Sequence, residues 1–521
     1  MASSSKLAGQ VLRFMKQQNN PAFPSFNGPQ LSAIEAALTR RMTMIQGPPG
    51  TGKTTVAAAI AFGFVHQCRS ISAQNSKVLC TAFSNVGADN LVESLLRLGL
   101  RVLRFGKPSG IAEPLWPYTV EAAIDQDAEA QKALRHAAAC RQPSASTTAA
   151  VKAAIEACSV ATTKAMRAAD VIVTTCTGAA DPRLLAACGI SASEASSVAG
   201  YADGAERFSA PDGLSPLSFP FVVHDEACQS TEPASLIPLL SSNSCRSLVL
   251  LGDPCQLPPT VISKESPVLS VSLMERLSAT LPNPCIIPPA DTTSKVTDYL
   301  DTLPIKQAVS FAMPWKRESR RSTSYRKVFS GALLLSVQYR MHPSIAALPS
   351  ALFYDALLST PRLLDRKFPE SIQRMPLLSG VPGMAVRVID VGGPENERRG
   401  NPSSAERVST AFQDPKTFWN EVEALKTLDV LRHVMASNDP TVSSIGVIAP
   451  YQGQVQLIKT YIANDPFIRE KLASSNPISI EVKSVDGYQG RVSSLKSDFR
   501  RLTLCRISGT RFGDIFHREV K

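Results

Sequence analysis

Residues 47–54 read Gly47-Pro48-Pro49-Gly50-Thr51-Gly52-Lys53-Thr54, between the apolar run Met42–Gln46 and the helix-forming stretch Thr55–Val65. This order of strand, glycine-rich loop and helix is the context in which a GxxxxGK[ST] loop binds phosphates. The glycines let backbone N–H groups face a phosphate, and the N-terminus of the following helix adds a favourable dipole. We predict nucleotide contacts from Gly47 to Thr55, with Lys53 on the β- and γ-phosphates and Thr54 on Mg²⁺.

An acidic pair follows a second apolar run. Phe219–Val223 leads into His224-Asp225-Glu226, and a P-loop site needs an acidic metal partner at the end of another strand. Asp225 is predicted to hold Mg²⁺, and Glu226 to orient and deprotonate the attacking water. His224 stands where an apolar residue is expected, and the alternation of a strand predicts that its side chain points outward.

Short apolar or β-branched runs recur between helix-like segments. They lie at 78–82, 101–105, 171–175, 219–223 and 248–251, with a second set at 385–390, 445–449 and 478–485. Strands of this kind, bounded by turn residues, are typical of parallel sheets covered by helices. We therefore predict an α/β fold with two such domains. The Ala-rich composition of 121–139 and 147–169 predicts two helices inserted in the first domain.

The length of 521 residues exceeds that of one ordinary domain. The segment 282–328 is rich in Pro, Ser and Lys/Arg and has no sustained periodicity, which favours a flexible insertion or linker. The predicted parts are an N-terminal extension at 1–25, a first domain at 26–280 with a helical insertion at about 107–169, a linker at 281–330, an incomplete second domain at 331–491 and a basic tail at 492–521.

Composition limits the partners. The formal charge of +11 and the pI near 9.1 favour polyanions, with nucleic acid the first expectation and a membrane surface the second. The eleven cysteines show no zinc-like spacing, and we expect them to be reduced. No apolar run reaches the length of about 20 residues that spans a bilayer. We expect a cytoplasmic or nuclear monomer without a membrane partner.

Three further motifs follow Asp225-Glu226-Ala227-Cys228-Gln229 along the chain. They are Leu251-Gly-Asp-Pro-Cys-Gln-Leu-Pro-Pro259, Gln338-Tyr-Arg-Met-His-Pro343 and Ser484-Val-Asp-Gly-Tyr-Gln-Gly-Arg491. The P-loop and the acidic pair alone also fit a kinase, a GTPase or a chaperone-like ATPase. The ordered series resembles the superfamily-one helicases of the nonsense-mediated-decay type over residues 26–491. The resemblance implies two RecA-like domains in tandem, ATP with Mg²⁺, and single-stranded RNA or DNA as partner.

The resemblance also implies residue roles at the nucleotide. Asn27 and Gln30 correspond to the adenine-reading motif, and an amide suits the edge of adenine because it both donates and accepts. Tyr339 is expected to stack on the base, although a buried core tyrosine is the alternative. Gly490 is expected to be a further nucleotide contact.

On the phosphate side, the resemblance implies that Gln256 contacts the γ-phosphate and reports its presence to the nucleic-acid groove. Arg340 corresponds to an arginine finger that reaches across from the second domain to neutralise transition-state charge. ATP held by Lys53 on one domain and Arg340 on the other would then close the two domains, and hydrolysis would release them.

Two segments match groove motifs of the family. Ser84 with Asn85, and Thr175 with Thr177, are expected to contact backbone phosphates of the strand, because hydroxyl and amide donors suit contacts that ignore sequence. The alternative for both is a strand-end cap. These contacts leave RNA and DNA undistinguished.

The family pattern breaks after Arg491. Position 492 is Val where the family carries Glu, and no second arginine-finger motif follows before Lys521. We expect the tail to lack the apolar strand pattern that finishes the second domain. Two hypotheses stay open: an ATP-driven helicase or translocase, and an ATP-binding nucleic-acid-binding protein with weak or lost unwinding.

Overall fold

The structure is a computed structural model. It describes residues 9, 13, 25–70, 75–140, 145–190, 215–242, 244–261, 263, 265–280, 331–361, 389, 391, 396–400, 417–437, 444–474, 478–485 and 501–505. The predicted linker at 281–330, all but one residue of the predicted strand at 385–390, and Gly490 lie outside these residues.

The chain divides into two compact units. The first comprises Met1–Lys295, Arg326–Met341 and Pro349–Pro361, and the second comprises Val296–Tyr325, His342–Leu348 and Arg362–Lys521. Both are α/β, as predicted for tandem RecA-like domains. No helix among the described residues is long and apolar enough to span a membrane.

A seven-stranded parallel sheet forms the first unit, in the order β3-β4-β2-β5-β6-β1-β7. Its strands are β1 Met42–Gln46, β2 Ser76–Ala82, β3 Val102–Arg104, β4 Val171–Thr175, β5 Ser218–Asp225, β6 Ser247–Gly252 and β7 Leu333–Leu334. The strands predicted in this region are confirmed. Parallel strands place all their carboxyl ends at one edge of the sheet, so the P-loop after β1 and the acidic pair after β5 share that edge.

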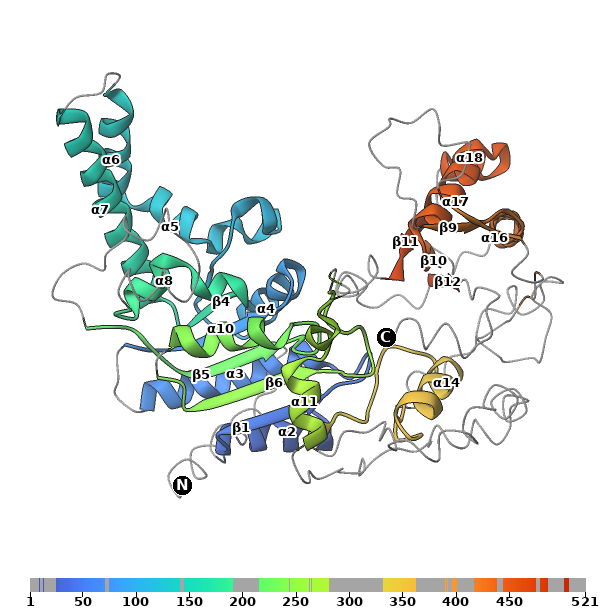
Figure 1. The fold of residues 1–521 in the computed structure, drawn as a ribbon, viewed down its shortest axis with the longest axis horizontal. Coiled ribbons are helices and arrows are strands. Elements are labelled where there is room, and N and C mark those ends of the chain that lie inside the picture. Colours follow the sequence, from blue (N-terminus) through green and yellow to red (C-terminus); the bar gives the residue numbers. More distant parts are fainter. Residues whose placement is uncertain are drawn as a thin grey trace. The chain divides into compact units, whose positions relative to one another are not determined.

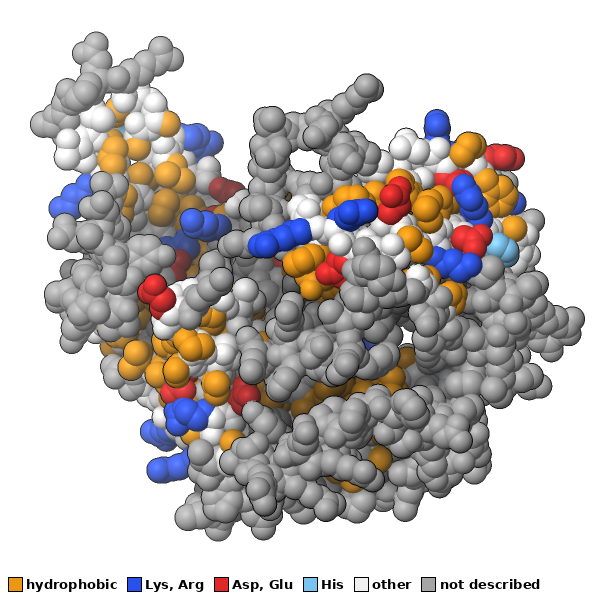
Figure 2. Space-filling model, turned by 45° about the vertical axis from the view of Figure 1, so that its right-hand side comes forward, with side chains coloured by type: hydrophobic (Ala, Val, Ile, Leu, Met, Phe, Trp, Pro, Cys, Tyr) orange, Lys and Arg blue, Asp and Glu red, His pale blue; other side chains and the backbone are white. Residues whose placement is uncertain are grey.

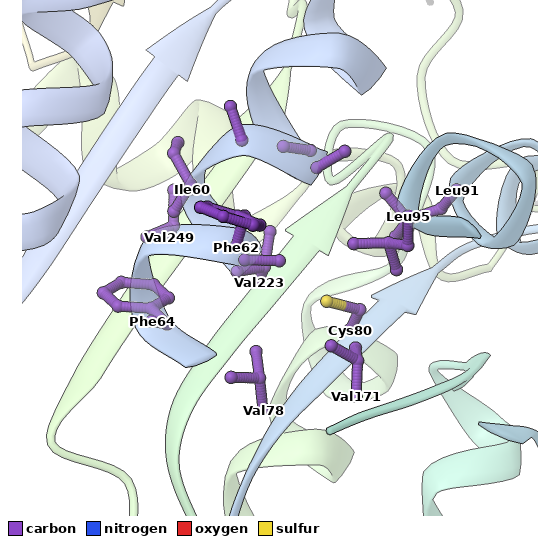
Figure 3. Close-up of a cluster of buried hydrophobic side chains, with 14 of the residues drawn as sticks. Ile60, Phe62, Phe64, Val78, Cys80, Leu91, Leu95, Val171, Val223 and Val249 are labelled. Atoms are coloured by element: carbon purple, nitrogen blue, oxygen red, sulfur yellow. The ribbon is translucent and has the colours of Figure 1, made fainter. Parts of the chain in front are cut away.

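Helices cover both faces of this sheet (Figure 1). One face packs against α2 Gly28–Thr39, α3 Lys53–Ser70 and α4 Asn85–Arg97. Figure 3 shows the core on this side, where Phe64 of α3 and strand residues such as Val223 meet. The other elements of the unit are η1 Pro108–Gly110, η2 Glu113–Tyr118, η3 Thr177–Ala180, α8 Pro182–Ala187, α10 Glu232–Ser242, η5 Pro267–Ser270 and α11 Leu273–Thr280.

The helical insertion contains three helices, α5 Val120–Gln126, α6 Ala128–Ala139 and α7 Ala145–Ala168. The prediction of two helices is therefore wrong in one respect, because the segment 121–139 breaks at Asp127. The Asp127 carboxylate accepts a hydrogen bond from the backbone N–H of Ala130 at 3.1 Å, so it caps the start of α6 where α5 ends. Figure 1 shows α6 and α7 as a hairpin projecting from the first unit.

Strand β7 pairs with β1, as Ile45 lies opposite Leu333 and Gln46 opposite Leu334. The predicted boundary at residue 330 therefore needs correction, because residues 331–341 belong to the first unit. An apolar run identifies a buried strand but does not say which sheet the strand joins. Helix α14, Pro343–Phe353, follows and contributes residues to both units.

The second unit contains a three-stranded parallel sheet in the order β11-β10-β12. Its elements are β8 Glu397–Arg399, β9 Phe418–Asn420, α16 Glu421–Ala436, β10 Ser444–Ala449, α17 Gln452–Asn464, α18 Pro466–Leu472, β11 Ser479–Ser484 and β12 Arg501–Cys505. Apolar residues of α16 and α17 pack on β10 and β11, with Leu431 and Ile445 fully buried.

The expectation that the tail adds no strand is wrong. Strand β12 lies within the tail and pairs with β10 from Ser444 opposite Arg501 to Ile448 opposite Cys505. The sequence did not predict this strand because it is short, and Leu502 and Leu504 supply its only aliphatic alternation.

Candidate functional site

The P-loop is shaped at Gly50, whose φ of +79° lies in the left-handed region that favours glycine. A Cβ at this position would lie 2.5 Å from the Cβ of Arg340, so the loop and the Arg340 segment touch there. The backbone N–H of Tyr339 donates to the Gly50 carbonyl at 2.9 Å. Lys53 Nζ donates to the Gly47 carbonyl at 2.6 Å, which keeps the ammonium over the loop.

Asp225 ends β5 and is almost fully buried, with 1% of its surface exposed. Burial raises the pKa of Asp225 to about 6, and the neighbouring Glu226 carboxylate adds to the rise. The Lys53 ammonium and a hydrogen bond with Thr54 act in the opposite direction. The structure thus brings together Thr54 and Asp225, the two predicted Mg²⁺ ligands.

Glu226 has a φ of 55°, a left-handed backbone conformation that is costly for a residue with a side chain. Its Oε2 accepts a hydrogen bond from Gln229 Nε2 at 3.1 Å, and its backbone N–H donates to Asp225 Oδ1 at 2.9 Å. The turn therefore fixes the Glu226 carboxylate beside Asp225. Gln229 thus orients the Glu226 carboxylate, a role that the sequence did not suggest.

Asp253, in the turn after β6, is a buried acceptor that sequence reasoning missed. Its Oδ2 accepts from Gln256 Nε2 at 2.6 Å and from the Tyr354 hydroxyl at 2.7 Å, and its Oδ1 accepts from Gln46 Nε2 at 3.2 Å. Gln256 also lies 3.5 Å from the carbonyl of Gly47 in the P-loop. Asp253 thus holds Gln256 at the loop.

Arg340 follows β7 in the first unit, on the same unit as Lys53. Its role as an arginine finger stays a prediction, although Arg340 groups with the first unit rather than with the second. Gln338, fully buried, accepts from the backbone N–H of Arg340 at 2.9 Å and of Met341 at 2.7 Å, and so shapes the turn that presents Arg340. Desolvation by the surrounding protein atoms lowers the pKa of Arg340. The nearby Glu226 carboxylate acts in the opposite direction and raises it.

The predicted adenine-reading residues stand at the start of α2. Asn27 caps this helix, since its side chain accepts from the backbone N–H of Gln30, and Gln30 returns a contact to the backbone N–H of Asn27. Gln30 Nε2 also donates to the Thr51 carbonyl at 3.0 Å, and Asn27 Nδ2 donates to the Tyr339 hydroxyl at 2.9 Å. Tyr339 is 45% exposed, so the core alternative for it is wrong.

His224 does not point outward as predicted. Both faces of the sheet are covered, and 1% of the His224 surface is exposed. The ring is hydrogen-bonded to the hydroxyl groups of Thr81 at 3.0 Å and Ser230 at 3.2 Å, and it lies against the Cys176 thiol. Burial lowers the pKa of His224 to about 4, so the ring is neutral near pH 7.

We expect His224 to make the protein less stable as the pH falls from about 6.5 to about 4. The unfolded chain takes up a proton near the ordinary pKa of about 6.5, whereas the folded ring resists it, and the full shift corresponds to about 3 kcal/mol. Urea unfolding across this range should show a smaller loss in His224→Leu than in the wild type. The raised pKa of Asp225 acts in the opposite direction but is present in both proteins. Equal pH dependence of the two proteins would contradict the expectation.

The four predicted nucleic-acid contacts meet at one edge of the sheet, because Ala82 of β2 lies opposite Thr175 of β4. Ser84 is the N-cap of α4 and accepts from the backbone N–H of Gly87 at 3.0 Å. Thr175 Oγ1 accepts from the N–H of Gly178 at 3.1 Å. Asn85 and Thr177 are exposed. Ser84 and Thr175 thus cap backbone N–H groups, which is the alternative role considered for these segments. The four residues nevertheless lie at the same edge of the sheet.

Two family profiles match the chain, each described as an AAA domain, one over residues 25–165 and 207–264 and the other over residues 321–495. "Regulator of nonsense transcripts 1 homolog" of Arabidopsis thaliana is 27% identical over 90% of this chain and 29% of its own length. The chain belongs to the superfamily-one helicases of the nonsense-mediated-decay type.

Further relatives of this helicase-family chain are "ATP-dependent helicase upf1" of Schizosaccharomyces pombe and "DNA-binding protein SMUBP-2" of Mesocricetus auratus. The first is 27% identical over 94% of this chain and 42% of its own length. The second is 27% identical over 89% of this chain and 38% of its own length. The chain thus spans less than half the length of these relatives.

Net charge alone does not mark a nucleic-acid surface on this helicase-family chain. On the face shown in Figure 2, the described Lys and Arg side chains are interspersed with acidic and apolar ones and do not gather into one basic area. The edge of the sheet that carries Ser84, Asn85, Thr175 and Thr177 is therefore the better candidate surface for a polyanion.

Proposed function

We propose that this chain is an ATP-dependent helicase or translocase that couples ATP hydrolysis to movement on single-stranded nucleic acid. One observation carries the proposal: the P-loop, the Asp225–Glu226 pair, Gln256 and Arg340 converge on one site in the first unit. Phosphoryl transfer requires cations for the phosphates, a carboxylate for the attacking water and polar groups that position the γ-phosphate, and this site offers each of them.

In this proposal Lys53 leaves the Gly47 carbonyl to bind the β- and γ-phosphates of ATP, and Arg340 neutralises charge that develops in the transition state. Glu226 orients the attacking water and takes its proton. Gln256, held by Asp253, contacts the γ-phosphate. Asn27 and Gln30 face the base, and Tyr339 stacks on it.

The residues present fit Mg²⁺, because Thr54 and Asp225 offer a hydroxyl and a carboxylate oxygen side by side. Mg²⁺ bound there would neutralise phosphate charge. Burial and the neighbouring Glu226 carboxylate raise the pKa of Asp225, and a bound cation would favour its charged form.

Single-stranded RNA or DNA is the proposed partner. Relatives are named as ATP-dependent helicases and as a DNA-binding protein, which supports a nucleic-acid partner and leaves its sugar undecided. The same names favour an active motor over an ATP-binding protein that no longer unwinds, and Lys53, Glu226 and Arg340 in the first unit support it.

We expect ATP turnover that rises on adding single-stranded oligonucleotide, together with strand displacement from a duplex with a single-stranded overhang. The measurement is phosphate release by the full chain, with and without oligouridylate or oligothymidylate. Lys53→Ala is the control, since it removes the cation over the loop, and it should abolish both activities. ATP binding without turnover would favour the non-unwinding alternative, and equal activity of Lys53→Ala would reject the assigned site.

A further inference from the structure

Arg104, at the end of β3, is fully buried, with 0% of its side chain exposed. Its Nε donates to Asp89 Oδ1 at 3.0 Å, its Nη2 donates to Asn85 Oδ1 at 3.0 Å, and its Nη1 donates to the carbonyl of Phe105. A guanidinium desolvated to this degree is costly unless its donors are matched, and here each nitrogen has an acceptor. Arg104 is thereby fixed in position.

A hydrogen bond and a glycine fix the partners of Arg104. The second oxygen of Asp89 accepts from the backbone N–H of Ala112 at 3.0 Å, so the carboxylate that pairs with Arg104 has both oxygens engaged. Gly110 of η1 borders the Asn85 amide: a Cβ on Gly110 would lie 2.7 Å from Asn85 Nδ2. The Asn85 amide therefore lies between a buried cation and a glycine that leaves room for it.

The cation determines which way the amide faces. A guanidinium has only donors, so Asn85 must present its oxygen to Arg104 and its NH₂ group away from it. Asn85 is exposed at the start of α4. The adjacent Ser84 hydroxyl accepts from a backbone N–H, which leaves its hydrogen to donate. This edge of the sheet thus offers donors, which suit phosphate oxygens.

We propose that Arg104 is a positioning residue for nucleic-acid binding: it orients the Asn85 amide so that the NH₂ group donates to a backbone phosphate of the single strand. Arg104 itself touches no phosphate, because it is buried. The inference rests on the proposed function, since it names how one contact of the proposed strand is made.

Binding of a fluorescein-labelled oligouridylate of about 12 nucleotides tests the proposal by fluorescence anisotropy. Asn85→Ala should weaken binding by about tenfold, the usual worth of one hydrogen bond to a charged group. Arg104→Lys keeps the charge but loses the fork that holds Asp89 and Asn85 together, and it should weaken binding to a similar extent. In the Asn85→Ala background, Arg104→Lys should have little further effect.

Salt dependence separates positioning from direct contact. If Arg104 acts through the neutral Asn85, Arg104→Lys lowers affinity without changing the slope of log Kd against log salt concentration. A changed slope, or additive losses in the double variant, would overturn the proposal.

Gly110→Ala provides a second route if Arg104→Lys unfolds. The new methyl group displaces the Asn85 amide and leaves the Arg104–Asp89 pair intact, so we expect unchanged thermal stability and unstimulated ATP turnover, with about tenfold weaker oligonucleotide binding. Unchanged binding by Gly110→Ala would count against the proposal. If the wild type itself binds no oligonucleotide, both the proposed function and the role of Arg104 fail. If the wild type binds and the Arg104 and Gly110 variants bind equally well, only the role of Arg104 fails.

Discussion

Glu226→Gln should lower ATP turnover by about 10²- to 10⁴-fold, because it removes the proposed general base. Glutamine has nearly the same size as glutamate, and its carbonyl oxygen can still accept the hydrogen bond from Gln229. Both side chains meet the same left-handed backbone at position 226, so the substitution adds no backbone strain. ATP binding should persist, since Lys53 and the rest of the P-loop are unchanged. Phosphate release gives the turnover, and a fluorescent ATP analogue gives the affinity.

Glu232→Gln is the matched control. Glu232 begins α10 in the same unit, and its carboxylate pairs with Arg276 at 2.6 Å, so the same chemical change falls outside the nucleotide site. Turnover of this variant should equal that of the wild type. Comparable turnover of Glu226→Gln and the wild type would assign the base elsewhere.

Local sequence patterns predicted most of the first sheet and the ends of its strands. The P-loop, the acidic pair and the runs at 78–82, 171–175 and 248–251 each carry their signal within a few neighbouring residues, and the structure places strands there. Buried parallel strands read as continuous apolar runs, which explains why these segments were identified.

Side-chain partners distant in sequence were not predictable in the same way. The Tyr354 hydroxyl meets Asp253 across 101 positions, and Gln46 meets Asp253 across 207. Strand alternation alone places the His224 side chain outside, but both faces of this sheet are covered, so the ring is buried. Its polar partners Thr81 and Cys176 lie 143 and 48 positions away in the sequence, and only the fold brings them to the ring.

Arg340 bears most directly on the mechanism, because it groups with the same unit as the P-loop. Closure of two domains by ATP held between Lys53 and Arg340 stays a prediction, and in this structure both residues group with the first unit. Arg340 instead belongs to the phosphate side of one preassembled site, in contact with Gly50.

Arg340→Ala should accordingly reduce turnover by about 10³-fold or more, the effect expected on removing an arginine that stabilises the transition state of phosphoryl transfer. The loss should appear in kcat, with ATP affinity little changed, because the charge it neutralises develops only during reaction. Arg340→Lys should recover part of the rate, since lysine supplies charge without the planar fork. Arg276→Ala is the control, as it removes an exposed arginine of the same unit.

The outcome distinguishes a catalytic arginine from one that only shapes the P-loop. A structural role at Gly50 would weaken ATP binding in Arg340→Ala and leave the rate at saturating ATP close to that of the wild type. A catalytic role lowers the saturated rate, and the lowering should be as large without nucleic acid as with it, because Arg340 and the P-loop already touch in the first unit. A defect confined to the nucleic-acid-stimulated rate would instead require that Arg340 acts through a rearrangement driven by the bound strand.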